Sequence, residues 1–427
     1  MTTDPPPAAD APPAPIELVE PVEPVEPWMI EDADYESAQP VEPLPDWAFA
    51  EQWAPRMIPV PWRRPLAAAW WGLTAAVGTL SLAVFMAVLA AIPLLNFYVL
   101  GALLDVEGRV ARSGRVRNSF RLWGVAPRVG GCALGVWLFL LPIRLLASFA
   151  SDARLIDPAG GPAKALTTAT TVVAVAVAVH LLLAISRGGR FSTFFRPVKN
   201  LRDFAGRLRR GRLLRDWDEA AAGFLSWFEF RRLWWLGVRG FAAGLLWLAV
   251  PTALYVSAEN PEGGEMLLVV IGFLLLTAVN CWLPVLQANL AAEERFRAGF
   301  ALRTARRQFN AAPWAWLLAV FLLYLLTLPL HLFRVYLLPS DAAWLVTLVF
   351  VVTIFPTRVI VGLAAARSRR RHAEGLKAPW YSRLPAKLLL VAVVGLYTGL
   401  LFLTQFIGSH GRAVLFEQHA FLLPWPG

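Results

Sequence analysis

Few side chains in this sequence have the type and spacing that catalysis or metal binding requires. The chain has no HExxH, GxSxG or GxGxxG motif, and its five histidines and two cysteines do not form a metal-ligand pattern. Ser409 and His410 resemble a nucleophile beside a base, but neighbouring helix residues project about 100° apart and cannot form the required hydrogen bond. We therefore predict no catalytic residue, no cofactor site and no metal site, and we expect that the protein is not an enzyme.

Uncharged polar residues inside an apolar stretch are the better functional candidates. Thr277, Asn280, Pro284 and Gln287 recur every three or four positions, which places them on one face of a helix. Burying such groups is costly unless they are hydrogen-bonded. Thr277, Asn280 and Gln287 are thus a candidate intramembrane polar face. One interpretation is hydrogen bonding that holds the helices together, and the other is the wall of a solute pathway kinked at Pro284.

Ionisable residues near the ends of the apolar stretches form a second candidate. Arg144, His331, Arg334 and Asp341 are expected to cluster at the outer side of the membrane. Arg358 lies near a cytoplasmic end, where a long side chain can reach the interface, so it needs no special role. No acidic residue is expected at the centre of a span, although such residues usually couple transport to protons or sodium.

Composition shows which elements must position these residues. Of 427 residues, 57% are hydrophobic and 16% are charged, whereas soluble domains carry about 25% charged residues. This excludes an ordinary water-soluble enzyme and predicts an all-α polytopic helical membrane bundle. Residues 1–65 differ, with thirteen carboxylates, three arginines and sixteen prolines. We predict a disordered acidic tail over residues 1–60, which is not a signal peptide, followed by a helical transmembrane domain over 61–427.

Apolar runs of about 20 residues predict the spans. Seven are clear, at 129–150, 166–186, 233–257, 266–292, 313–333, 342–364 and 388–411. The uncharged run 66–104 is too long for one crossing, and we expect a break at Ile92-Pro93-Leu94-Leu95-Asn96 because proline removes a helix hydrogen bond. Nine spans are therefore predicted, with eight as the alternative.

The distribution of basic residues predicts the orientation. Segments 105–128, 187–232, 293–312 and 365–387 hold thirty Arg and Lys residues together. The positive-inside rule predicts that these segments lie on the cytoplasmic side of the membrane. With nine spans the N-terminus is cytoplasmic and the C-terminus lies outside; with eight the tail lies outside.

An internal duplication of 66–215 and 233–387 is a further hypothesis. Glu107 precedes Leu141-Pro142 by the same distance as Glu294 precedes Leu328-Pro329. The alternative is accidental similarity between apolar, arginine-rich stretches, since few residues are identical between the halves.

Two of these stretches carry a resemblance to a known group of proteins. Residues 91–101 (AIPLLNFYVLG), running into 105–109 (DVEGR), and residues 286–298 (LQANLAAEERFRA) resemble segments of bacterial multispanning membrane proteins known only as domains of unknown function. The resemblance implies a helical bacterial membrane protein, and it brings no catalytic residue with it.

These features favour a structural or interaction protein of the bacterial cytoplasmic membrane, with a small-solute transporter or channel as the alternative. Segment 187–215 is basic with interleaved apolar residues, which predicts an interfacial helix bound to anionic lipid headgroups. The acidic tail could compete for this segment in an intramolecular contact, or it could be inert. We expect no nucleic-acid partner, because adjoining spans hold the segment at the bilayer.

Overall fold

The computed structural model describes residues 65–119, 126–187, 189–209, 228–257, 263–335, 343–404, 416 and 421–423. Within these ranges the chain forms α-helices and short 3-10 turns, and none of these residues lies in a strand. The predicted all-α class is therefore confirmed. The predicted tail, residues 1–60, lies outside the described ranges.

Eight helices in the described ranges are long and apolar enough to cross a membrane, as judged by length and composition. They are α3 (Pro65–Ala91), α5 (Ala126–Ile156), α6 (Gly161–Ser186), α10 (Phe230–Tyr255), α11 (Gly264–Glu293), α13 (Pro313–Val335), α14 (Ala343–Ala373) and α15 (Trp380–Thr404). Between them lie the shorter helices α4 (Asn96–Ser113), α7 (Phe191–Phe194), α8 (Pro197–Arg209) and α12 (Leu302–Ala311), with 3-10 turns η1 (Val116–Asn118) and η3 (Phe296–Phe300).

The predicted break in the first apolar run is confirmed. Helix α3 ends at Ala91 and α4 begins at Asn96, and Leu94 between them has a positive φ of 69°. The Trp234 indole N–H donates to the Leu94 carbonyl at 2.8 Å, which holds this turn against α10. The second helix, α4, is not among the eight apolar candidates, because Asp105, Glu107, Arg109 and Arg112 lie within it.

Helix α4 lies at the centre of the fold, against α10, α14 and α11. Its approach to α10 depends on two glycines. A Cβ on Gly101 would lie 1.7 Å from the Leu233 carbonyl oxygen, and one on Gly237 would lie 1.8 Å from that of Phe97. Only glycine allows backbones to come this close. The charged C-terminal half of α4 is consequently enclosed by three apolar helices.

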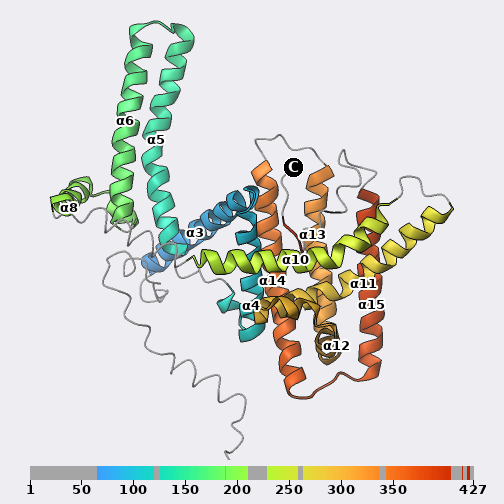
Figure 1. Ribbon diagram of the computed structural model, residues 1–427. Coiled ribbons are helices and arrows are strands. Elements are labelled where there is room, and N and C mark those ends of the chain that lie inside the picture. The colour runs from blue at the N-terminus through green and yellow to red at the C-terminus, as the bar shows by residue number, and fades with distance from the viewer. Residues whose placement is uncertain are drawn as a thin grey trace, which may run out of the picture.

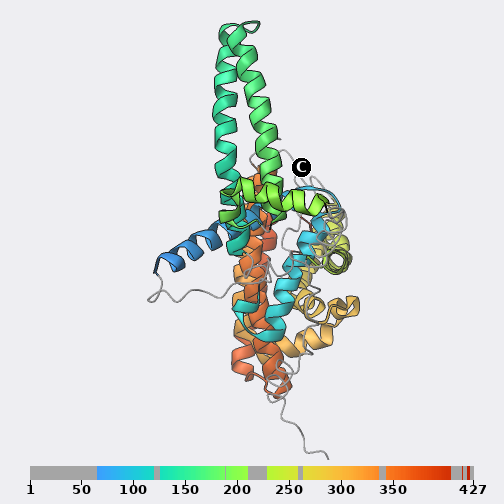
Figure 2. The same cartoon turned by 90° about the vertical axis from the view of Figure 1, so that its left-hand side faces the viewer.

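The remaining helices divide into a hairpin and a larger body. Helices α5 and α6 form a long hairpin that stands away from the body in both views (Figures 1 and 2). In the body, α10 and α11 run side by side across the group α13, α14 and α15 (Figure 1). Apolar side chains such as Leu145, Phe149 and Val172 are exposed on the hairpin, as expected for a lipid-facing surface.

Candidate functional site: a buried ion pair and a basic face

A buried ion pair joins two helices that are distant in sequence. Glu107 of α4 is 0% exposed and Arg358 of α14 is 2% exposed, and Arg358 Nη1 donates to Glu107 Oε2 at 2.7 Å. The same Nη1 also donates to Gln287 Oε1 of α11 at 2.9 Å. Arg358 therefore connects α4, α11 and α14 in the interior of the body.

This arrangement corrects two sequence-based expectations. Glu107 was expected in a basic cytoplasmic connection, and Arg358 was expected to extend to the interface. Both were wrong, because α4 packs between α10, α11 and α14 and so carries Glu107 to Arg358. An acidic group does lie in the interior, and it is paired.

The predicted polar face lies inside the body, but its members differ in their contacts. Thr277, Asn280 and Gln287 of α11 are all buried. Gln287 is bonded on both sides, since its amide nitrogen also donates to the Phe421 carbonyl at 3.1 Å. By contrast, neither side-chain atom of the Asn280 amide has a hydrogen-bond partner among the described residues, and neither has Thr277 Oγ1. Gln287 therefore links α11 to Arg358 and to Phe421, whereas the side chains of Asn280 and Thr277 form no hydrogen bond within the part of the chain that the structure describes.

Aromatic and polar side chains surround the backbone at Asn280. The Tyr324 hydroxyl of α13 donates to the Asn280 carbonyl at 2.7 Å. The Tyr324 ring stacks on that of Tyr397 of α15, with centroids 4.2 Å apart. The Tyr397 hydroxyl lies 3.3 Å from His331 Nε2. This cluster brings His331 into the interior between α13 and α15.

The predicted outer ionisable cluster is assembled only in part within the described residues. Arg144 is exposed on α5 of the hairpin, whereas His331 is buried on α13 in the body, so the structure does not bring these two together (Figure 1). Arg334 belongs to α13, but its side chain lies outside the description, as does all of Asp341.

A second charge network surrounds the start of α10. Arg232 donates to Asp105 Oδ1 at 2.8 Å and to Glu229 Oε2 at 2.7 Å, and it also pairs with Glu294. Arg112 donates to the Ala292 carbonyl at 2.9 Å, near the C-terminus of α11. These arginines satisfy carboxylates and helix-end carbonyls that would otherwise lack partners.

The helix ends after α4 and α11 share one backbone conformation. Gly114 and Glu294 are left-handed, with φ of 66° and 53°, and each is followed by an extended arginine and a 3-10 turn. If the two helix ends are aligned on Gly114 and Glu294, Glu107 corresponds to Gln287, because each lies about two helical turns before its helix end. Both bind Arg358. This pairing differs from the pairing of Glu107 with Glu294 on which the duplication of 66–215 and 233–387 was predicted, and the duplication stays a hypothesis.

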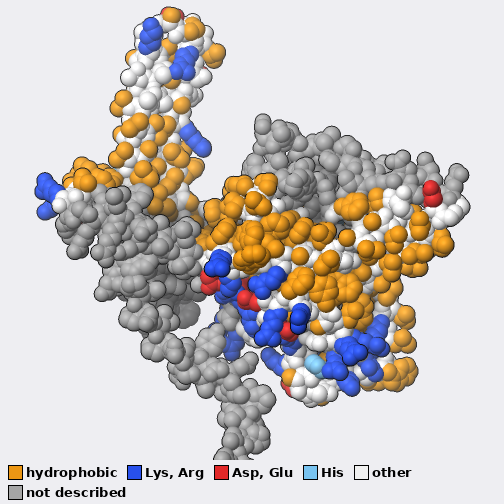
Figure 3. All heavy atoms as spheres, viewed as in Figure 1, with side chains coloured by type: hydrophobic (Ala, Val, Ile, Leu, Met, Phe, Trp, Pro, Cys, Tyr) orange, Lys and Arg blue, Asp and Glu red, His pale blue; other side chains and the backbone are white. Residues whose placement is uncertain are grey.

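Basic side chains gather at one end of the body. Figure 3 shows them below the apolar band, around α12 and the turn between α14 and α15. None of them forms an ion pair with a carboxylate of the described residues. We call this surface the basic face, and it comprises Arg303, Arg306, Arg307, Arg367, Arg370, Arg371, Lys377 and Arg383.

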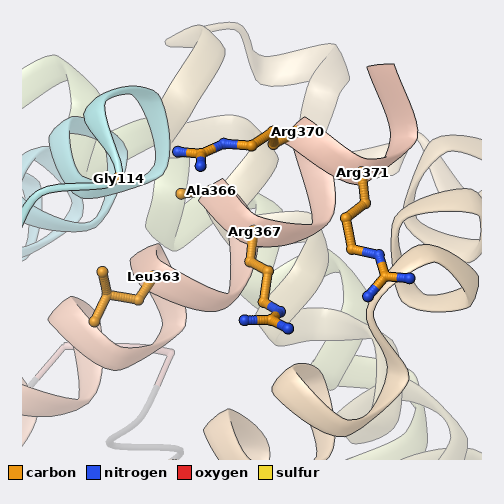
Figure 4. A pocket seen from close by; sticks show the side chains of 6 residues that line it. All are labelled: Gly114, Leu363, Ala366, Arg367, Arg370 and Arg371. Carbon is orange, nitrogen blue, oxygen red and sulfur yellow. The ribbon is translucent and has the colours of Figure 1, made fainter. Parts of the chain in front are cut away.

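Two cavities open on the basic face. The α14 pocket, about 430 Å³, is lined by Gly114 of the α4 end and by Leu363, Ala366, Arg367, Arg370 and Arg371. In Figure 4 the Arg370 side chain extends toward Gly114, while Arg367 and Arg371 extend from the other side of α14. The α12 pocket, about 520 Å³, is lined by Arg303, Arg306, Arg307, Asn310, His372, Lys377 and Arg383. Both cavities offer guanidinium groups suited to anions.

Comparisons of the chain were made with protein-family models, curated proteins and solved structures. None of the three found a match. The assignment of a function therefore depends on the geometry described above.

Proposed function

We propose that the chain is a structural or interaction protein of the bacterial cytoplasmic membrane, whose basic face lies on the cytoplasmic side and engages anionic lipid headgroups. The observation that carries this proposal is the basic face itself. Its arginines are not neutralised by described carboxylates, and they border apolar helices of spanning length. The positive-inside rule supports a cytoplasmic position for such a surface.

Exposed aromatic residues support a position of the basic face in the headgroup zone of the bilayer. Trp314, Trp380 and Tyr381 are exposed beside the α12 pocket, at the starts of α13 and α15. Amphipathic rings of this kind prefer the headgroup zone of a bilayer. Basic side chains at that depth each gain ~1 kcal/mol from an anionic leaflet.

Helix α8 provides a second basic surface. Val198, Leu201 and Leu208 are exposed along one side of this helix, which also carries Arg202. The helix is held to the end of α6, since Arg187 pairs with Asp203 at 2.6 Å. An exposed apolar stripe with flanking arginines is typical of a helix lying in the membrane interface.

Lipid selectivity tests the proposal. The full chain would be reconstituted in phosphatidylcholine with spin-labelled phosphatidylglycerol or spin-labelled phosphatidylcholine as the reporter. We expect the anionic reporter to associate several-fold more strongly at low salt and to lose most of this preference near 1 M salt. Equal association of the two reporters at low salt would contradict the proposal.

A small-solute transporter is the second candidate function. The supporting observation is the set of interior polar atoms without a hydrogen-bond partner among the described residues: Thr277 Oγ1, both atoms of the Asn280 amide and Glu107 Oε1. Buried groups of this kind usually mark a pathway or an unfilled polar contact. Substitution of Asn280, described in the Discussion, separates the two candidates.

A further inference from the structure

We infer that the α12 pocket is a specific site for the phosphate-bearing headgroup of an anionic phospholipid. This inference rests on the proposed function, since it assumes that the basic face meets the cytoplasmic leaflet. It goes further by assigning one cavity, one ligand class and the residues that hold it.

The pocket is built from three separate segments of the chain. Helix α12 contributes one wall, the last turn of α14 contributes His372, and the stretch that leads into α15 contributes Lys377 before the helix and Arg383 in its first turn. Two contacts join the walls. The Ala378 amide donates to the Asn310 carbonyl at 3.0 Å, and the Trp314 indole donates to Ser382 Oγ at 2.9 Å. The site is consequently formed before a ligand arrives.

The lining has a strong positive charge. It holds four arginines, one lysine and one histidine, and no carboxylate. Like charges gathered around one cavity repel each other, and an anion removes that repulsion. Guanidinium groups bind phosphate oxygens through paired, charge-assisted hydrogen bonds. The charge and the donor type both favour a phosphate group.

Two polar atoms of the lining indicate how the headgroup would be held. Arg383 Nε and Asn310 Oδ1 are buried and have no hydrogen-bond partner among the described residues. The Nε–H group can donate to a phosphate oxygen, and the amide oxygen can accept from a hydroxyl. A phosphate next to a hydroxyl-bearing group, as in a glycerol headgroup, supplies both partners.

The surroundings favour a lipid over a soluble phosphate. Trp380 and Tyr381 are 69% and 67% exposed beside the pocket, as residues of the headgroup zone would be. Leu384 and Leu388 follow one turn apart on the same side of α15 and are also exposed. They provide an apolar track on which acyl chains can lie once the headgroup is bound.

Native mass spectrometry of the full chain in detergent tests this inference. Phosphatidylglycerol, phosphatidylcholine and inorganic phosphate serve as the three probes. We expect one saturable phosphatidylglycerol adduct and weak phosphatidylcholine binding. Inorganic phosphate at the same concentration as the lipid should not displace the bound phosphatidylglycerol.

The double variant R306Q/R383Q should lose roughly tenfold or more in phosphatidylglycerol affinity. The matched variant R154Q/K164Q, which removes two exposed charges at the tip of the α5–α6 hairpin, should retain wild-type adduct formation within about twofold, because surface charges outside the pocket add little to a specific contact.

The outcomes separate this inference from the proposed function. If both double variants lose affinity equally, the pocket assignment is wrong, while the general role of the basic charges stands. If wild-type protein binds both lipids equally, both proposals fail. Displacement by inorganic phosphate would identify a soluble ligand and overturn the lipid assignment. If R306Q/R383Q melts at a lower temperature than wild type, its loss of affinity is not interpreted. The titration of wild-type protein with phosphatidylglycerol then decides: a single adduct that saturates supports the site, and adducts that increase in number without saturating overturn it.

Discussion

Individual residues in the interior show how charge is accommodated in this fold. Glu107 is preceded by Leu103 and Leu104 and followed by Val110 and Ala111, all at helical spacing, and all are buried. This apolar flanking was a sequence signal that Glu107 faces inward. The identity of its partner, Arg358, was not available from local sequence, because the two residues come from helices far apart in the chain.

Breaking the buried pair should destabilise the protein strongly. Glu107→Leu or Arg358→Met leaves one charge buried without its partner, which typically costs ~3–5 kcal/mol. The double variant E107L/R358M should recover part of this loss. Thermal unfolding in detergent measures the effect, and the exposed pair of Arg369 and Glu293 is the control, with an expected change below ~1 kcal/mol. A neutral effect of either single substitution would contradict this account.

Asn280 and Gln287 should respond differently to the same substitution. Gln287→Leu removes the partner of Arg358 and of the Phe421 carbonyl and should cost ~1–3 kcal/mol. Asn280→Leu removes a side-chain amide that has no hydrogen-bond partner among the described residues, so the melting temperature of this variant should equal or exceed that of wild type.

Flux measurements then separate the two candidate functions. If Asn280 lines a solute pathway, N280L should fold normally and alter solute flux or growth, whereas Q287L should act through stability. Normal growth and unchanged flux with N280L would count against the transporter. Lower stability of N280L would show that Asn280 has a packing role that its contacts do not reveal.

At the scale of elements, close helix contacts place α4. Gly237→Ala would put a Cβ 1.8 Å from the Phe97 carbonyl oxygen and force α4 and α10 apart. Overpacking of this kind costs ~1–3 kcal/mol, and a displaced α4 should also weaken the pair that Glu107 of α4 forms with Arg358 of α14. Gly72→Ala is the matched control, because a Cβ there meets nothing within 4 Å. Equal melting temperatures of G237A and G72A would show that α4 can move away from α10 without a loss of protein stability.

For the whole molecule, the eight apolar helices and the basic face predict a topology that can be tested in cells. In a variant with Cys132 and Cys281 replaced by alanine, we would introduce single cysteines at three positions. A cysteine in place of Glu374, at the turn after α14, should be shielded from impermeant thiol reagents in intact cells. A cysteine in place of Ser257, after α10, should react with them.

The third position, Ser37 in the predicted tail, reports whether the first apolar run crosses once or twice. Shielding at 37 supports nine spans, with α4 counted as a short crossing, and labelling supports eight. Labelling at 374 together with shielding at 257 would invert the orientation and place the basic face outside, which contradicts the proposed function.

The sequence by itself determined the helical class, most helix positions and the break between α3 and α4. These depend on local physics: long apolar runs must satisfy their backbone groups within one helix, and Pro93 removes a hydrogen bond at a defined place. The predicted spans 129–150 and 266–292, for example, lie within α5 and α11. Only the tertiary structure decided that α4 is enclosed by α10, α11 and α14, that Arg358 joins Glu107 to Gln287, and that α12 and α15 share a basic cavity. Those contacts join residues far apart in the chain, and they form because packing, which local periodicity does not encode, brings particular helix faces together.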